Sequence, residues 1–206
     1  MTRLLRVAAV AVLVGGAAAV LSSCSNDPGA IVTTTPTAPV TAEPVSSPSP
    51  TPSVTPEEEL LEQIPENARG EDFFSATQFA RFFLNLYPEL FAKDGSSGEL
   101  FSLLAGENCG FCNNALDNMD ETRAAQAYSV GSEFDFSWPL AQGGLREDGY
   151  TYVTEAFSVS ESVTYGPSGE ILDSAEPESG LVKLRLEYAD GHWVIDEVDF
   201  DFDEDA

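Results

Sequence analysis

The spacing of apolar residues changes near Tyr128, and this change constrains the fold more than any other feature of the 206-residue sequence. Upstream, apolar residues recur every three or four positions, which predicts a helix with one apolar stripe. The stripe comprises Phe79, Phe82, Phe83, Leu86 and Leu90. Downstream, apolar and polar residues alternate, which predicts β-strands. Helices followed by antiparallel strands predict an α+β domain whose helices pack on one face of a sheet.

Start and stop signals delimit the expected helices. A short helix is expected to open at Thr55-Pro56-Glu57-Glu58, where a cap residue, a first-turn proline and acids coincide, and to end before Pro65. The long helix is expected to open at Ser75, which has capping-box spacing to Gln78. Two further helices are expected over residues 100–105 and 113–126. The last three of these helices are expected to pack on the sheet.

Four strands are expected in the second half of the chain, over residues 128–138, 150–165, 181–189 and 192–202. Asp190-Gly191 is a strong hairpin signal between the last two. In the final strand Trp193 and Ile195 share one parity, whereas Val198 has the other. A bulge near Asp196-Glu197 is therefore expected, because it would place all three side chains on one face of the sheet.

Residues 1–23 have the layout of an export signal, with a basic start and an apolar run from Val7 to Leu21. The run leads into Leu21-Ser22-Ser23-Cys24, which resembles a bacterial lipobox. The resemblance implies cleavage before Cys24 and a diacylglycerol with palmitate-type chains on its sulfur. Several acyl chains anchor a protein firmly, so we expect a lipoprotein on the outer face of the cell membrane. The alternatives are an ordinary signal peptide and a transmembrane anchor, although the run is short of the ~20 residues that a span needs.

Residues 24–56 are expected to link the lipidated cysteine to a globular domain formed by residues 57–206. Eight of the 13 prolines lie in this segment, and Thr and Ser fill the gaps between them. Without apolar clusters such a segment does not offset the entropy of folding, and proline favours extended polyproline II. We interpret it as a disordered, semi-rigid stalk.

The chain carries 35 acidic residues against nine Lys and Arg, a formal net charge of −26 at pH 7. Phosphate binding needs clustered basic side chains, so this composition excludes nucleic acid as a partner. We interpret the acidity as a means of solubility at a crowded cell surface, with steering of cationic ligands as the alternative. The acidic end, Asp199–Asp205, lacks the spacing of a calcium loop and is expected to be a solvated strand face.

Cys109-Gly110-Phe111-Cys112 has the spacing of a thiol–disulfide redox pair. Redox pairs of this type need a lowered cysteine pKa at a helix start that follows a strand, whereas here a helix is expected before the motif. Cys109 and Cys112 are therefore expected to form a structural disulfide, which stabilises the fold by about 2 kcal/mol on the chain-entropy model. The alternatives are a redox pair and a metal pair.

His192 is the only histidine, so a zinc site at the cysteines would lack its further ligands. It follows the hairpin turn and is expected to be solvent-exposed. An acid–base pair with a neighbouring carboxylate is the alternative, but no oriented nucleophile accompanies it. The sequence therefore assigns no catalytic residue, no cofactor and no metal.

The order of elements resembles the cone-shaped α+β fold of nuclear transport factor, the limonene epoxide hydrolases and the SnoaL-like cyclases. The resemblance covers about residues 75–202, and its clearest part is the ending Asp190-Gly191-His192-Trp193-Val194-Ile195-Asp196-Glu197-Val198. It implies three N-terminal helices packed on a curved four-stranded antiparallel sheet. The lipobox, the Thr/Pro linker and the Cys-x-x-Cys pair make the chain similar to actinobacterial lipoproteins of unknown function.

Fold does not fix function, so several classes of function stay open. The sequence favours a non-catalytic binding or interaction module held at the membrane by Cys24. The alternatives are a small-molecule enzyme that uses a cone pocket and a redox protein acting through Cys109 and Cys112. A cavity lined by paired titratable groups would favour the enzyme, and a filled aromatic core would favour the module.

Overall fold

A computed structural model of the chain describes residues 54–136 and 140–203. The predicted signal peptide, the lipidation site Cys24 and the predicted linker up to residue 53 lie outside the described residues. The same holds for residues 137–138, the end of the first predicted strand.

The first half of the domain is helical, as predicted. Its helices are α1 (Pro56–Leu61), the 3₁₀ turn η1 (Glu66–Ala68), α2 (Phe73–Leu90), α3 (Gly98–Leu104) and α4 (Gly110–Ala124). Helix α1 begins with the capping box of Thr55 and Glu58. Helix α2 begins earlier than predicted, because Asp72 caps it by accepting a hydrogen bond from the Ser75 N–H at 2.9 Å. The capping box predicted at Ser75 is therefore wrong.

The second half consists of antiparallel strands. They are β1 (Tyr128–Gly131), β2 (Phe134–Phe136), β3 (Gln142–Leu145), β4 (Thr151–Val159), β5 (Ser162–Tyr165), β6 (Ile171–Ala175), β7 (Glu178–Ala189) and β8 (His192–Phe202). One sheet has the order β2-β4-β7-β8, with β3 paired to β4 beside β2, and a second sheet has the order β1-β5-β6. The prediction of one four-stranded sheet is therefore wrong, although the α+β class is confirmed.

Two of the predicted strands are each broken, and the breaks create the second sheet. The first break lies at Gly131 and Ser132, whose φ angles of 98° and 59° leave the extended region. A Cβ at Gly131 would lie 2.0 Å from the Glu161 carbonyl oxygen, so only glycine fits there. The second break lies opposite, where the Ser160 N–H donates to the Glu133 carbonyl oxygen at 3.0 Å. The chain therefore changes sheets at both points.

The bulge predicted in the last strand is confirmed. Along the β7–β8 pair, Arg185 lies opposite Glu197 and Leu186 lies opposite Ile195, so Asp196 is the extra residue. Ile195 is buried and Val198 is half-buried beyond the bulge. Both parities of the final strand therefore contribute to the same face.

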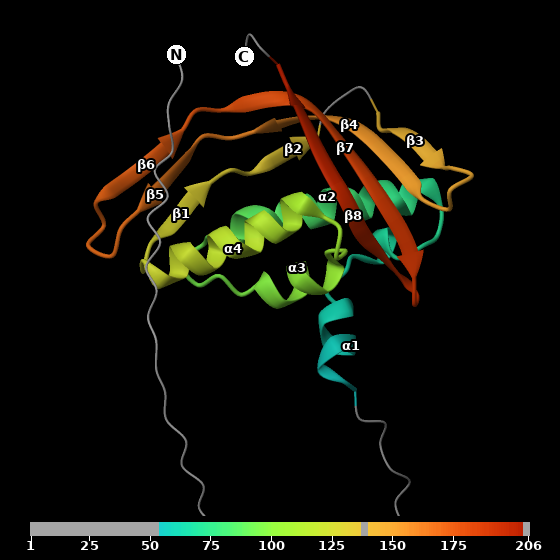
Figure 1. Cartoon of the computed structure of the whole chain (residues 1–206), viewed down its shortest axis with the longest axis horizontal. Coiled ribbons are helices and arrows are strands. Elements are labelled where there is room, and N and C mark those ends of the chain that lie inside the picture. Colours follow the sequence, from blue (N-terminus) through green and yellow to red (C-terminus); the bar gives the residue numbers. More distant parts are fainter. Residues whose placement is uncertain (1–53, 137–139, 204–206) are drawn as a thin grey trace, which may run out of the picture. The chain divides into compact units, whose positions relative to one another are not determined.

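Helices α2, α3 and α4 lie in the concavity of the curved sheet, and α1 stands apart from them (Figure 1). The core fills the space between the helices and the concave face. Phe83 of α2 and Phe101 of α3 stack with their ring centroids 4.5 Å apart, and both are fully buried. Burying a side chain of this size contributes about 1.5–3 kcal/mol. Within the ranges that the structure describes, no helix is both long and apolar enough to span a membrane.

Candidate functional site

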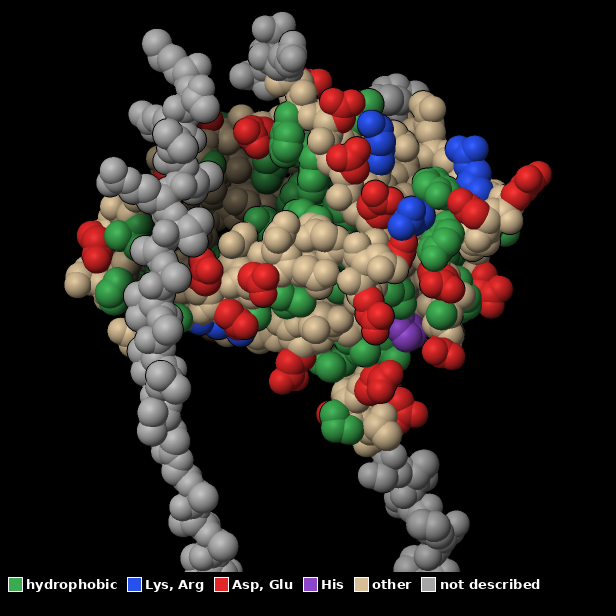
Figure 2. Space-filling view, viewed as in Figure 1, with side chains coloured by type: hydrophobic (Ala, Val, Ile, Leu, Met, Phe, Trp, Pro, Cys, Tyr) green, Lys and Arg blue, Asp and Glu red, His purple; other side chains and the backbone are tan. Residues whose placement is uncertain are grey.

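A cavity of about 220 Å³ opens at one end of the concave sheet face, and we call it the aromatic cleft. Six aromatic side chains line it: Tyr87, Phe111, Phe134, Phe157, Phe200 and Phe202. Figure 2 shows a hollow above the helical layer with hydrophobic side chains on its floor. Apolar concave sites with few polar groups are the usual binding sites of small molecules, so the cleft is the first candidate site.

Five different elements supply the aromatic walls. Tyr87 comes from α2 and Phe111 from α4, and their ring centroids are 5.3 Å apart. Phe200 of β8 lies 5.4 Å from Phe111 and 5.3 Å from Phe157 of β4. Phe134 of β2 lies 6.1 Å from Phe200. The rings therefore form one continuous apolar surface that joins the helical layer to the sheet.

The charged groups of the cleft are Glu176, from the β6–β7 connection, and Glu178, the first residue of β7, and Ser132, Ser160 and Ser162 add hydroxyls. Glu176 and Glu178 are exposed, and no lysine, arginine or histidine is among the described residues that line the cleft. Burial raises the pKa of the Tyr87 phenol, which is therefore neutral at physiological pH. The cleft thus combines a neutral aromatic interior with carboxylates at its edge.

Glu155 is the carboxylate buried on the concave face of the sheet, and it is only 3 % exposed. It lies on β4 and pairs with Arg81 of α2, whose Nε donates to Glu155 Oε2 at 2.9 Å and whose terminal nitrogen contacts the other oxygen. This pairing raises the pKa of the Arg81 guanidinium. The carboxylate is therefore compensated on both oxygens, an arrangement that does not suit a general base.

Sequence reasoning missed the Arg81–Glu155 pair. The signal was present in the alternation of β4, where Glu155 has the same parity as Val153 and Phe157. An acid on the apolar parity of a strand must find a partner, because burying an unpaired charge is costly. The sequence does not say which of the scattered cations supplies it.

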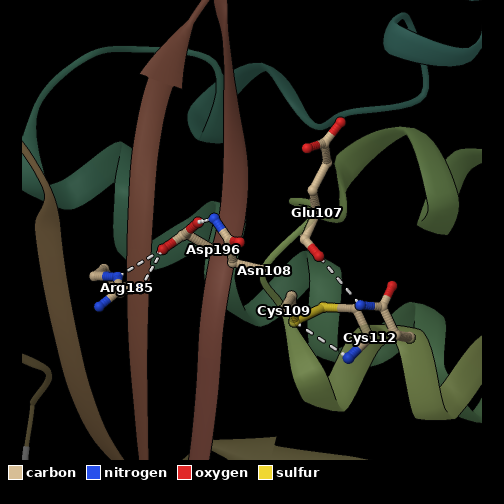
Figure 3. The surroundings of a disulfide bond; sticks show 7 residues. Glu107, Asn108, Cys109, Cys112, Arg185 and Asp196 are labelled. Atoms are coloured by element: carbon tan, nitrogen blue, oxygen red, sulfur yellow. Dashed lines mark hydrogen bonds and ion pairs between the residues drawn. A yellow bond between two sulfur atoms is a disulfide. The ribbon is translucent and has the colours of Figure 1, made fainter.

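Cys109 and Cys112 are brought together at disulfide distance, with their sulfur atoms 1.95 Å apart and both residues fully buried (Figure 3). Cys109 is also the N-cap of α4, and its sulfur accepts a hydrogen bond from the Cys112 N–H at 3.2 Å. Phe111 lies between the two cysteines and lines the aromatic cleft. The pair therefore holds the start of the helix that supplies one wall.

The segment before the cysteines is fixed to the β8 bulge. The Gly106 N–H donates to the Ile195 carbonyl oxygen at 2.7 Å, and the Asn108 amide contacts Asp196 at 3.4 Å. Asp196 in turn accepts from Arg185 Nε at 2.7 Å (Figure 3). This hydrogen bond to Asp196 is the largest contribution to the raised pKa of the Arg185 guanidinium. The extra residue of the bulge therefore connects β7 and β8 to the turn that carries the cysteines.

His192 lies away from the aromatic cleft, in a groove of about 410 Å³ that it lines with α1, η1 and Trp193. The prediction of an exposed histidine is wrong, because the residue is half-buried and its Nδ1 atom is fully buried without a hydrogen-bond partner in the described part of the chain. No carboxylate pairs with it there, so the structure gives no support to an acid–base role.

The structure describes the acidic C-terminal strand up to Asp203, and Glu204 and Asp205 of the predicted acidic end lie outside the described residues. Asp199, Asp201 and Asp203 are exposed, and Asp201 lies 3.6 Å from the Lys183 ammonium. Within residues 54–136 and 140–203, no three His, Cys, Asp or Glu side chains are grouped to hold a metal ion.

No protein-family model matches the chain, and no curated protein matches its sequence. Several solved structures align with it. The intermembrane space region of the chloroplast protein ARC6 matches with a TM-score of 0.50 at 10% identity, over 63% of this chain and 95% of that one. ActVI-ORFA from Streptomyces coelicolor matches with a TM-score of 0.37 at 14% identity, over 63% of this chain and 97% of that one.

Aln2 from a Streptomyces species matches with a TM-score of 0.36 at 13% identity, over 63% of this chain and 88% of that one. The match to the ARC6 region, at 10% identity, concerns the fold alone. The helices in the concavity of a curved antiparallel sheet agree with the cone-like α+β architecture that the sequence resemblance implied.

Proposed function

We propose that this chain is a lipoprotein held by Cys24 on the outer face of the cell membrane, and that its domain is a non-catalytic module that binds an apolar group in the aromatic cleft. The observation that carries the binding role is the cleft itself. Six aromatic side chains converge there on a cavity of about 220 Å³, and its two carboxylates come from the β6–β7 connection and the start of β7. Such a cavity provides burial for a ligand, and within the described residues no hydrogen bond orients its titratable groups as an acid–base pair.

The enzyme alternative is weaker because the titratable groups do not act together. Glu155 is occupied by Arg81, and His192 lines a different groove. Acid–base catalysis needs a donor and an acceptor within reach of one reacting atom. The lining of the aromatic cleft supplies two carboxylates, the neutral Tyr87 phenol and three serine hydroxyls, and no hydrogen bond joins a serine to a carboxylate of the lining within the described residues.

The redox alternative is weaker because the sulfur atoms are inaccessible. Thiol–disulfide exchange requires a thiolate to reach one sulfur of the pair, and both Cys109 and Cys112 are fully buried. Their contacts favour a structural role, since Cys109 caps α4 and its neighbour Asn108 contacts the β8 bulge.

The membrane location is supported by the sequence of residues 1–56. The apolar run before Cys24 fits an export signal, and the proline-rich segment fits a stalk that holds the domain away from the bilayer. The net charge of −26 suits a domain that stays free of anionic headgroups and nucleic acid.

Replacing the predicted lipidation site tests the anchor. Cells that express the full chain are grown with labelled palmitate and fractionated, and Cys24→Ala is compared with the control Ser25→Ala. We expect label and membrane association in the parent and in the control. Equal labelling of Cys24→Ala would contradict the lipoprotein assignment.

Blocking the cleft tests the binding role. Ala175 lines the cleft, whereas Ser174 is its neighbour on β6, and adjacent strand residues point to opposite faces. Ala175→Trp is expected to fill the cleft and abolish binding of benzyl alcohol, a small neutral probe, as measured by NMR titration. Ser174→Trp adds the same side chain outside the cleft and is expected to leave binding unchanged. Equal binding to both variants would refute the assignment of the cleft.

A further inference from the structure

We propose that the aromatic cleft selects cationic apolar ligands, namely small organic ammonium ions whose apolar group enters the cleft while the charge stays beside Glu176 and Glu178. This inference rests on the proposed binding function of the cleft and adds the chemical class of its ligand. Three properties of the described residues carry it: the uncompensated charge at the edge, the aromatic faces within, and the size of the cavity.

The charge at the edge of the cleft is negative and uncompensated. A neighbouring hollow shares Glu178 with the cleft and is also lined by Glu133 and Asp135. None of these carboxylates, nor Glu176, forms an ion pair within residues 54–136 and 140–203, and no Lys or Arg lines either cavity there. An anionic ligand would therefore be repelled. A cationic ligand could pair with these carboxylates without displacing a lysine or arginine.

The aromatic interior also favours a cation over a neutral ligand of the same shape. The face of an aromatic ring carries negative electrostatic potential, and a cation near it gains roughly twofold to thirtyfold in binding. Phe202 is 48 % exposed and packs edge-on against Phe157 at 5.8 Å between centroids, so ring surface is available close to the opening. The neutral Tyr87 phenol adds a hydroxyl without adding charge.

The size of the cavity limits the ligand to a small apolar group. A volume of about 220 Å³ is below the ~300–1,000 Å³ of sites for drug-sized molecules. A single phenyl ring or branched alkyl group with an ammonium at the opening matches both the volume and the charge. The net charge of −26 further raises the local concentration of cations around the domain.

Three probes with one common benzyl group test the selectivity: benzyltrimethylammonium, benzyl alcohol and benzylsulfonate. They are titrated into the full chain carrying Cys24→Ser, so that the proposed lipid does not bind the probes, and binding is followed by NMR at low and at high salt. At low salt we expect the cation to bind roughly fivefold more tightly than the alcohol, and the sulfonate to bind more weakly than the alcohol. The preference for the cation over the alcohol is expected to shrink at high salt.

A double substitution assigns the preference to the cleft. Glu176→Gln/Glu178→Gln is expected to remove most of the preference for the cation and to leave affinity for the alcohol within about twofold. Glu147→Gln/Glu187→Gln makes the same change in net charge at exposed positions outside the cleft lining and is the matched control, expected to keep the preference.

The outcomes separate this inference from the proposed function. If none of the probes binds, the binding function of the cleft fails together with the inference. If all three bind equally, or the sulfonate binds best, the cleft is a binding site and the cation selectivity is wrong. Loss of the preference in the control as well as in the cleft variant would assign it to net charge alone and would also overturn the inference.

Discussion

The ion pair between Arg81 and Glu155 provides the sharpest test of how the helical layer is held on the sheet. Glu155 is 3 % exposed, whereas the Arg81 side chain is 29 % exposed. The two residues therefore differ in what is left behind when the partner is removed. Without Arg81, a carboxylate stays buried among apolar side chains, and without Glu155, the guanidinium still reaches water.

This asymmetry sets the expected magnitudes. Removing one partner of a buried ion pair costs about 3–5 kcal/mol, because a charge is left uncompensated. We expect this full loss for Arg81→Met. For Glu155→Leu we expect about 1.5–3 kcal/mol, the value of lost hydrogen bonds to a charged group, because Arg81 can be hydrated. The double variant replaces both charges by apolar side chains and is expected to lie within about 1 kcal/mol of the parent.

The assay is urea unfolding of the parent, both single variants and the double variant, with the change in unfolding free energy taken from the midpoints at constant slope. The coupling energy follows from the double-mutant cycle. If Glu155→Leu costs as much as Arg81→Met or more, the difference in burial does not govern the pair. If the losses of the single variants add up in the double variant, the two side chains do not interact and the reasoning fails.

Three further predictions concern the cysteines, the first helix and one glycine. Cys109→Ala/Cys112→Ala is expected to stay folded, but its free energy of unfolding in urea should fall by about 2 kcal/mol, because the disulfide no longer restricts the short loop in the unfolded chain. An unchanged urea midpoint would contradict this. The Thr55 N–H donates to the Glu58 carboxylate and lowers its pKa from the usual 4.5. The resulting stabilisation of the first turn of α1 is present above about pH 4.5 and is lost as the pH falls through the lowered pKa of the folded state. The amide NMR shifts of this turn should follow the same titration. Gly106→Ala would place a Cβ 2.9 Å from a β8 carbonyl oxygen and is expected to cost about 1–3 kcal/mol in thermal unfolding, whereas Gly110→Ala, with nothing within 4 Å, should change stability by less than about 1 kcal/mol.

The parts of the fold that could be predicted are those set by local pattern. The alternation of Val182, Leu184 and Leu186 marked the buried face of β7, and all three are buried. The change of parity between Ile195 and Val198 identified the bulge in β8. In each case a few adjacent residues carry the whole signal, because side-chain period and face are properties of one strand.

The division into two sheets could not be predicted, because it depends on pairing between distant segments. The break at Gly131 is imposed by the carbonyl oxygen of Glu161, thirty residues later in the chain. Strand β6 is exposed along its whole length and has no apolar alternation to reveal it. Strand β3 contains Gly143 and Gly144, both at positive φ, a composition that reads as a turn.

The sequence predicted the positions of some residues of the aromatic cleft, but not that they come together. The parity of the strands placed Phe157 and Phe200 on the inner face, and the helical stripe of α2 did not include Tyr87. Their convergence on Phe111 follows from how α4 packs across the sheet, which no single segment specifies. The local pattern therefore predicted the inner face of the sheet, whereas the site itself depends on how the helices pack against that face.

The disulfide and the bulge acquire a common role once the cleft is considered. Phe111 lies between the two cysteines, and Phe200 lies on β8 four residues beyond Asp196. Asn108 joins the two regions through Asp196, while Cys109 caps the helix that carries Phe111. The 5.4 Å contact between Phe111 and Phe200 is therefore fixed on the helical side by the cysteine turn and on the sheet side by the bulge. Two features that are independent in the sequence thus hold opposite walls of one cleft against each other.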